Sequence, residues 1–213
     1  MKKRIAVITG ASSGIGLAAV KEFLLNGDRV YGLSRRECPE QGSISIPCDV
    51  TDEAAVRAAI ERIIEVEGRI DVLVCNAGFG ISGAVEFTEM SEAKKQFDVN
   101  FFGTAACIRA ALPHMREKGR GHIIVTSSVA GSIPIPFQAF YSATKSAING
   151  RVDVAAGDVS DGVSHRYDNK TESQRCQNIS THSAFCAAAC NDRGTATEYD
   201  QYECTDDLSQ ILS

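Results

Sequence analysis

The residue types best suited to chemistry stand together in the middle of the chain. An apolar run at residues 122–125 predicts a buried strand, and Ser127 and Ser128 stand at its end, just after Thr126. Tyr141 and Lys145 are four residues apart, so in a helix they lie on one face, one turn apart. A hydroxyl at a strand end, with a phenol and an ammonium nearby, can transfer a proton to a carbonyl oxygen. A tyrosine–lysine pair at this spacing is also common on exposed helices, so its meaning depends on the rest of the chain.

The first 27 residues predict a strand, a glycine-rich turn and a helix. The apolar strand at residues 4–9 leads directly into Gly10, Gly14 and Gly16, and Gly27 ends the helix that follows. Glycines let the backbone approach a pyrophosphate, and a helix N-terminus offers unpaired N–H groups and the positive end of a dipole. A tight turn without a ligand would also use glycines, but the position between strand and helix favours a dinucleotide cradle.

The end of the second predicted strand, residues 29–34, bears on the choice of cofactor. A carboxylate there would accept hydrogen bonds from the adenosine ribose. The sequence instead has Ser34, followed by Arg35 and Arg36, and a guanidinium pairs well with a phosphate. This favours NADP(H), with NAD(H) as the other possibility, although two arginines at a strand end are also an ordinary solvated pair.

The remaining elements of the first 150 residues continue the alternation of strand and helix. Strands are predicted at residues 43–47 and 70–75, a helix opens at Thr51 or Asp52, and residues 91–115 form one long helix or two in series. With the strand at residues 122–125, this predicts an α/β fold with a doubly wound parallel sheet, Rossmann-like, with ligand at the carboxyl ends of the strands.

Five motifs, in this order, resemble the short-chain dehydrogenase/reductase family. They are TGxxxGxG from Thr9, the triplet NAG at residues 76–78, a helix asparagine at Asn100, a serine thirteen residues before Tyr141, and YxxxK. The resemblance covers residues 1 to about 150 and implies a catalytic set of Ser128, Tyr141, Lys145 and Asn100. It implies cofactor contacts from Gly10, Ser12, Ser13, Gly14, Ile15, Gly16, Ser34, Arg35, Arg36, Asp49, Val50, Asn76, Ala77, Gly78, Tyr141 and Lys145, and no metal.

The resemblance also implies a role for each catalytic residue. Tyr141 exchanges a proton with the substrate, Lys145 favours its phenolate form and binds the nicotinamide ribose, and Ser128 hydrogen-bonds the substrate oxygen. Asn100 holds a water that links the lysine to solvent, although a buried asparagine can also be a plain core polar group.

The resemblance implies roles at the cofactor for three further residues. Asp49 takes the adenine amino group, or contributes to the cap of the following helix. Asn76 holds neighbouring strands together, and Gly78 leaves room for the cofactor.

Composition narrows the functional class. The chain has 213 residues, of which 44% are hydrophobic, and contains no apolar run of about 18 residues, so we expect one globular domain without a membrane span. The N-terminal apolar stretch is too short for a secretory leader, so a cytoplasmic location is expected. Residues 1–150 hold 17 basic and 16 acidic residues, so no nucleic-acid partner is expected. Four widely spaced cysteines are expected to be buried, reduced thiols: Cys38, Cys48, Cys75 and Cys107.

The character of the sequence changes after Gly150. Residues 151–213 contain no proline, and Val, Ile, Leu, Phe and Met number nine in 63, which predicts an atypical, poorly ordered polar tail. No continuing helix and no further strand is predicted there, so the family's C-terminal part is expected to be truncated or replaced. The family's homo-oligomer is therefore in doubt.

Two functions remain open at this stage. One is an NADP(H)-dependent oxidoreductase that transfers a hydride between nicotinamide and a small carbonyl or secondary-alcohol substrate. The other is a catalytically silent dinucleotide-binding remnant of such an enzyme.

Overall fold

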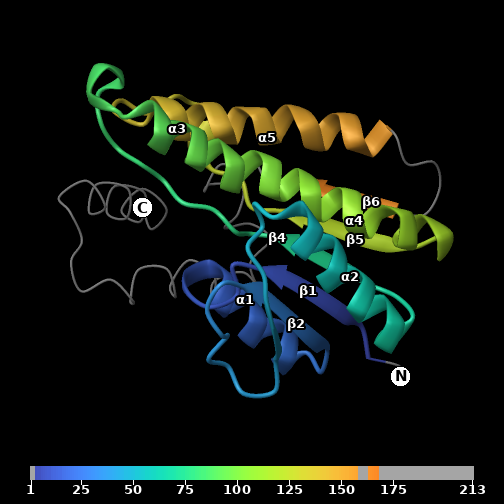
Figure 1. Cartoon of the computed structure of the whole chain (residues 1–213). Coiled ribbons are helices and arrows are strands. Elements are labelled where there is room, and N and C mark those ends of the chain that lie inside the picture. Colours follow the sequence, from blue (N-terminus) through green and yellow to red (C-terminus); the bar gives the residue numbers. More distant parts are fainter. Residues whose placement is uncertain (1–2, 158–162, 168–213) are drawn as a thin grey trace, which may run out of the picture.

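The computed structural model describes residues 3–157 and 163–167 of the chain. Six parallel strands form its centre, in the order β3-β2-β1-β4-β5-β6 (Figure 1). Their bounds are β1 Ile5–Thr9, β2 Arg29–Ser34, β3 Ile44–Pro47, β4 Val72–Cys75, β5 Gly121–Val125 and β6 Val163–Tyr167. The predicted doubly wound parallel sheet is confirmed. The chain reverses its direction of winding between β1 and β4, where ligands bind in sheets of this kind.

Five α-helices accompany the described strands: α1 Gly14–Leu25, α2 Glu53–Glu67, α3 Met90–Phe97, α4 Thr104–Glu117 and α5 Ala139–Gly157. Short 3₁₀ turns lie at η1 Val85–Phe87 and η3 Val129–Gly131, and a π-helical segment, η2 Asp98–Gly103, joins α3 to α4. The helix predicted at residues 91–115, as one long helix or two in series, is thus formed by α3 and α4, which are joined without a break by the π-helical segment η2. Figure 1 shows it lying alongside α5. Among the described residues, no helix is both long and apolar enough to cross a membrane.

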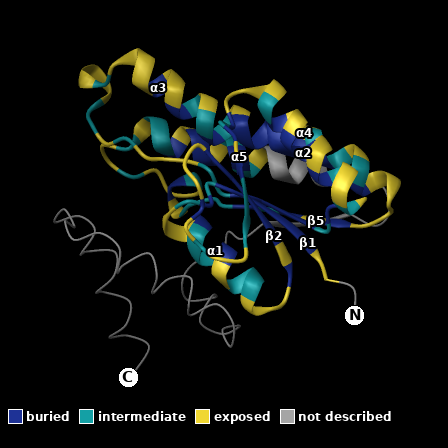
Figure 2. Ribbon diagram, turned by 60° about the horizontal axis from the view of Figure 1, so that its bottom comes forward, coloured by how far each residue is buried: buried dark blue, intermediate teal, exposed yellow. Residues whose placement is uncertain are grey.

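The strands are buried on both faces because their side chains alternate between two cores. In β1, Ile5 and Val7 pack in the larger core, together with α2, α4 and Ile148 of α5. Ala6 and Ile8 point to the opposite face, where they meet α1. Figure 2 shows the strands as the buried centre and the outer helix faces as exposed.

The prediction that no helix or strand continues past residue 150 is wrong. Helix α5 runs to Gly157, and β6 pairs with β5 from Gly121↔Val163 to Val125↔Tyr167. The peptide VSHRY of β6 lacks an apolar run, so hydrophobic pattern could not identify a strand that forms by backbone pairing at the sheet edge. The rest of the predicted polar tail, residues 158–162 and 168–213, lies outside the described residues.

The amino ends of the strands are tied together by Asp71. Its Oδ2 accepts from the backbone N–H of Ile5 at 2.8 Å and from Arg69 Nε at 2.8 Å. Arg69 is only 8% exposed, and its guanidinium also donates to the carbonyl of Lys3 at 2.7 Å. This network fixes β1 against β4 at the edge of the sheet opposite the expected ligand.

Replacing Asp71 with alanine should lower the free energy of unfolding by about 3 kcal/mol, because Arg69 would be left buried without its counter-charge. The measurement is urea unfolding at pH 7. Glu117→Ala is the matched control: its carboxylate lies 4.0 Å from Lys118 on the surface, so a loss below roughly 0.5 kcal/mol is expected. Equal losses in the two variants would contradict this account.

Candidate active site

One threonine and one asparagine connect the strand ends at the switch point between β1 and β4. The Thr9 hydroxyl oxygen accepts from the backbone N–H groups of Asn76 and Ala77, both at 2.9 Å. The Asn76 amide donates to the Thr9 carbonyl at 3.2 Å and accepts from the Thr126 hydroxyl at 3.4 Å. Asn76 therefore links the ends of β1, β4 and β5, as its predicted strand-holding role requires.

The glycine-rich turn has the shape of an anion cradle. Gly10 and Gly14 have φ of 68° and 53°, in the left-handed region. A Cβ at Gly16 would lie 2.2 Å from the Gly10 carbonyl oxygen, so the backbone approaches itself too closely for any side chain. Ser13 is the N-cap of α1, and within the described part of the chain its side chain makes no capping hydrogen bond. The N–H groups of the first turn are therefore available to an anion, which fits a dinucleotide pyrophosphate.

Two exposed arginines stand at the carboxyl end of β2. The buried Ser34 hydroxyl donates to the Arg36 carbonyl at 2.5 Å, which shapes the turn after the strand. Both Arg35 and Arg36 are exposed. Their guanidinium groups can reach a phosphate in solution at this edge of the sheet.

Asp49 and Val50 follow β3 at the same edge. Asp49 Oδ1 accepts from the Thr51 backbone N–H at 3.0 Å and from its hydroxyl at 2.8 Å. The backbone hydrogen bond is the main cause that lowers the pKa of Asp49, and the charge of Arg35 adds to it. The N-cap of α2 is Asp52, not Asp49. Val50 is buried, and a Cβ on Gly103 of η2 would lie 2.7 Å from its Cγ2.

Tyr141 and Lys145 lie one turn apart on α5, as predicted. The Lys145 ammonium is 5.7 Å from the centre of the Tyr141 ring and donates to the Thr126 carbonyl at 2.8 Å. Burial lowers the pKa of Lys145 from 10.5 to about 8. At neutral pH the side chain is still mainly an ammonium, so a positive charge stands beside the phenol. A Cβ at Gly80 would lie 3.5 Å from the Tyr141 ring, so the loop after β4 packs against the phenol.

The two serines after β5 have different partners. The Ser127 hydroxyl donates to Asn149 Oδ1 on α5 at 2.6 Å. Ser128 is the N-cap of η3, and its Oγ accepts from the Ala130 N–H at 3.2 Å. Accepting this bond leaves the O–H of Ser128 able to donate, and the choice of Ser128 over Ser127 as the catalytic serine stays a prediction.

Asn100 lies in the π segment and is 1% exposed. Its Oδ1 accepts from the Phe79 N–H at 3.0 Å, and its Nδ2 donates to the Phe79 carbonyl at 2.9 Å and to the Thr144 hydroxyl at 3.1 Å. Its side chain therefore fixes the loop after β4 against the helix that carries Lys145. A Cβ at Gly78 would lie 3.1 Å from Asn100 Oδ1, so this glycine leaves room for the asparagine. The role in holding a water stays a prediction.

Several residues that position the site were not predicted from the sequence: Thr9, Gly80, Thr126, Thr144 and Asn149. Two of these could have been noticed in the sequence, since Thr9 directly precedes the first glycine of the turn and Thr144 directly precedes Lys145. The contacts of Gly80, Thr126 and Asn149 depend on how loop and helix meet in space, which no local pattern reports.

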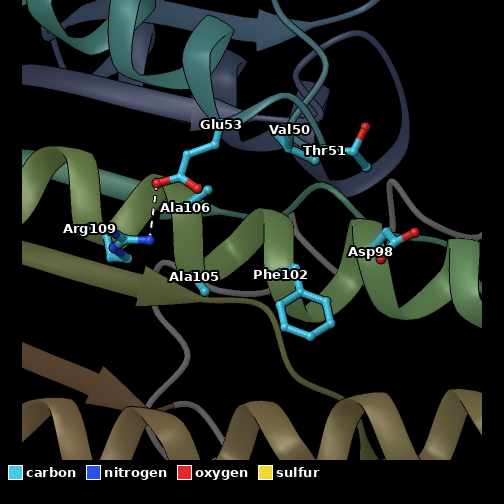
Figure 3. Close-up of a pocket in the computed structure, with 8 residues that line it drawn as sticks. All are labelled: Val50, Thr51, Glu53, Asp98, Phe102, Ala105, Ala106 and Arg109. Carbon is cyan, nitrogen blue, oxygen red and sulfur yellow. Dashed lines mark ion pairs between the residues drawn. The ribbon is translucent and has the colours of Figure 1, made fainter.

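A cavity on the described surface lies away from these residues. This cavity has a volume of about 480 Å³ and is lined by Val50, Thr51, Glu53, Asp98, Phe102, Ala105, Ala106 and Arg109 (Figure 3). Arg109 reaches across it to Glu53 at 3.0 Å, the ion pair drawn in Figure 3. Of the predicted site residues, Val50 is the one that lines this cavity, so the cavity is not the place where Tyr141 and Lys145 meet.

The described cysteines are free, buried thiols, as expected: Cys38, Cys48, Cys75 and Cys107. Burial raises the pKa of Cys48 to about 11, which makes it a poor nucleophile. Within residues 3–157 and 163–167 no cluster of His, Cys, Asp and Glu is suited to a metal ion.

Comparison with known proteins agrees with the geometry. The family model for short chain dehydrogenase matches residues 4–164. The chain is 43% identical over 160 residues to a 3-ketodihydrosphingosine reductase of Bacteroides thetaiotaomicron, covering 75% of this chain and 60% of the relative. It is 36% identical over 168 residues to human 17-beta-hydroxysteroid dehydrogenase type 1, covering 70% and 50%.

A solved structure, "ElxO with NADP Bound", is 34% identical, with a TM-score of 0.70. The match covers 74% of this chain and 68% of that one. The chain spans only 50–60% of the length of the two curated relatives.

Substitution of Lys145 with methionine should raise the free energy of unfolding at pH 7 by roughly 2 kcal/mol. The lowered pKa of Lys145 corresponds to a cost of about 3 kcal/mol for burying the ammonium, and the variant no longer has this cost. The variant also loses the hydrogen bond to the Thr126 carbonyl, which stabilises the wild type by about 1 kcal/mol. Below pH 8 both folded and unfolded states hold the proton, so the gain is constant. Between pH 8 and 10.5 the unfolded wild type binds more protons, so wild type gains stability and the advantage of the variant shrinks.

Urea unfolding at pH 7 and pH 9.5 checks this, with the exposed Lys95→Met as control. A difference between Lys145→Met and wild type that does not change with pH would show that Lys145 keeps an ordinary pKa.

Proposed function

Because this chain belongs to the short-chain dehydrogenase family, we propose that it transfers a hydride between NADP(H) and a carbonyl or secondary-alcohol substrate. One observation carries the proposal. Helix α5 holds Tyr141 and a buried Lys145 ammonium against the end of β5, at Thr126, two residues before Ser128. The uncapped glycine turn lies at the same edge of the sheet.

The residues divide the work of a carbonyl reduction among them. A bound nicotinamide supplies the hydride to the carbonyl carbon, and takes it back in the reverse direction. Tyr141 donates its phenolic proton to the carbonyl oxygen. The Lys145 ammonium stabilises the phenolate that forms, and Ser128 donates a hydrogen bond to the oxygen as negative charge develops there. In alcohol oxidation the same proton moves back to Tyr141.

The preference for NADP(H) rests on Arg35 and Arg36. Both are exposed at the end of β2, and the position before them is Ser34, so no carboxylate there repels a 2′-phosphate. The solved structure of ElxO, which is similar in fold, holds NADP. NAD(H) is the alternative cofactor.

The surroundings of Tyr141 support a substrate with an apolar body. The loop after β4 contacts the Tyr141 ring at Gly80. Large hydrophobic side chains are exposed in that loop, in η1 and in the segment between β5 and α5: Phe79, Val85, Phe87, Ile133 and Phe137. The Gly83 N–H donates to the Phe137 carbonyl at 2.7 Å, which joins the two loops. The names of the two curated relatives, a ketodihydrosphingosine reductase and a hydroxysteroid dehydrogenase, point to apolar carbonyl and alcohol compounds.

A silent dinucleotide-binding protein is the second candidate, and the extent of the family match favours it. The match ends at residue 164, although the chain continues to residue 213. Titration with NADPH, followed by its fluorescence, beside a turnover assay on apolar ketones separates the two. Binding without turnover supports the silent protein.

Tyr141→Phe should lower kcat/KM for ketone reduction by roughly 10²–10⁴-fold, because the general acid is lost while the ring and its packing stay. The affinity for NADPH should stay within about twofold. Tyr31→Phe is the control, since the Tyr31 hydroxyl donates to Glu67 in the core and has no part in the reaction. Equal activity of Tyr141→Phe and wild type would remove Tyr141 from the mechanism.

Arg35→Ser should weaken NADPH binding by about 10–100-fold, the range expected for one charge-assisted contact to phosphate. NADH binding should change by less than about twofold, because NADH lacks the 2′-phosphate. Fluorescence titration with both cofactors measures this, with the exposed Arg57→Ser on α2 as the matched control. Equal weakening for NADPH and NADH would mean that Arg35 does not recognise the phosphate.

A further inference from the structure

We propose that Asn149 is a positioning residue that aims the Ser128 hydroxyl at the substrate oxygen. The inference rests on the proposed function and concerns the same site. Asn149 lies on α5 one turn beyond Lys145.

Helix α5 holds the segment from Thr126 to Gly131 at three points. The Lys145 ammonium donates to the Thr126 carbonyl at 2.8 Å. Asn149 Oδ1 accepts from the Ser127 hydroxyl at 2.6 Å, and the Ser146 hydroxyl donates to the Gly131 carbonyl at 2.9 Å. Ser128 lies between the second and third of these contacts.

The fit between η3 and α5 is close at Asn149. A Cβ on Gly131 would lie 2.8 Å from Asn149 Nδ2 and 2.9 Å from the Lys145 carbonyl oxygen. The asparagine amide therefore fills the space between the strand end and the helix, with Gly131 on one side and Ser127 on the other. A shorter side chain at residue 149 would leave a gap there.

The contact at Ser127 also determines which way Ser128 faces. Ser128 is extended, with φ −155° and ψ 157°, and neighbouring side chains of an extended chain point to opposite sides. With the Ser127 hydroxyl held by α5, the Ser128 hydroxyl is directed away from Asn149. Its hydrogen bond from the Ala130 N–H, at 3.2 Å, uses only an acceptor site on the oxygen.

The hydrogen bond between Ser127 and Asn149 can persist throughout the proposed reaction. In the role proposed for it, Lys145 binds ribose hydroxyls, and its bond to the Thr126 carbonyl then weakens. The bond between Ser127 and Asn149 involves no group with a proposed contact to cofactor or substrate. It can therefore keep Ser128 in place throughout the reaction.

Ketone reduction by the full chain tests the proposal, with 2-undecanone as probe and NADPH as reductant. Asn149→Ala should lower kcat about tenfold, with KM for the ketone and affinity for NADPH within about twofold of wild type. Asn149→Asp, whose carboxylate still accepts from Ser127, should recover most of the rate at its own optimal pH. Ser43→Ala removes a hydroxyl bonded to the Glu40 carbonyl in a distant loop and should match wild type.

The decisive comparison places Asn149→Ala in a Ser128→Ala background. If Asn149 acts through Ser128, the second substitution lowers kcat by less than about twofold, because no hydroxyl remains to be positioned. A further tenfold loss there, or no loss in the single variant, would overturn the proposal. A purely structural role would lower stability and still leave kcat per folded molecule unchanged.

The proposal can also be tested if the wild type does not reduce any ketone, an outcome that would refute the proposed function. Amide hydrogen exchange then reports on the Ala130 N–H, which the Ser128 oxygen holds. Exchange at least tenfold faster in Asn149→Ala, with Val125 unchanged, supports the positioning role. Unchanged exchange at Ala130 overturns it.

Discussion

The arrangement of the site depends on the hydrogen bond from the buried Lys145 ammonium to the backbone at the end of β5. Lys145 is 6% exposed and donates to the Thr126 carbonyl, the first residue after β5. Removing a charge from water is costly, and the carbonyl and the nearby phenol ring only partly offset that cost. The fold accepts this because the bond holds α5 at the carboxyl edge of the sheet. Tyr141 is positioned by the same contact.

A second constraint acts at the neighbouring strands. Thr9 and Asn76 form hydrogen bonds with each other between the ends of β1 and β4, and the Asn76 side chain accepts a hydrogen bond from Thr126, which follows β5. The glycine turn, the loop after β4 and the catalytic helix therefore meet through a short chain of hydrogen bonds. The loop after β4 is fixed in turn by Asn100, through Phe79 and Thr144. A site built on these contacts is preorganised by backbone groups at three strand ends.

The sequence predicted the fold because its elements leave local signals, and it named candidate site residues whose roles stay predictions. Alternating apolar runs and the turn from Gly10 to Gly16 identified the parallel sheet and its ligand edge, and the spacing of Tyr141 and Lys145 identified one helix face. Strand β6 was missed because its backbone pairing needs no apolar run. The partner of Ser127 was missed because Asn149 is 22 residues away, and only the packing of α5 on η3 brings the two together.

The most direct measurement of the central claim is a crystal structure of the chain with NADP⁺. The account predicts the pyrophosphate on the turn from Gly10 to Gly16, the 2′-phosphate at Arg35, and the nicotinamide beside the Tyr141 hydroxyl and Lys145. A nicotinamide placed elsewhere, such as in the cavity lined by Phe102 and Arg109, would contradict it. So would a bound cofactor with Tyr141 and Ser128 facing different regions.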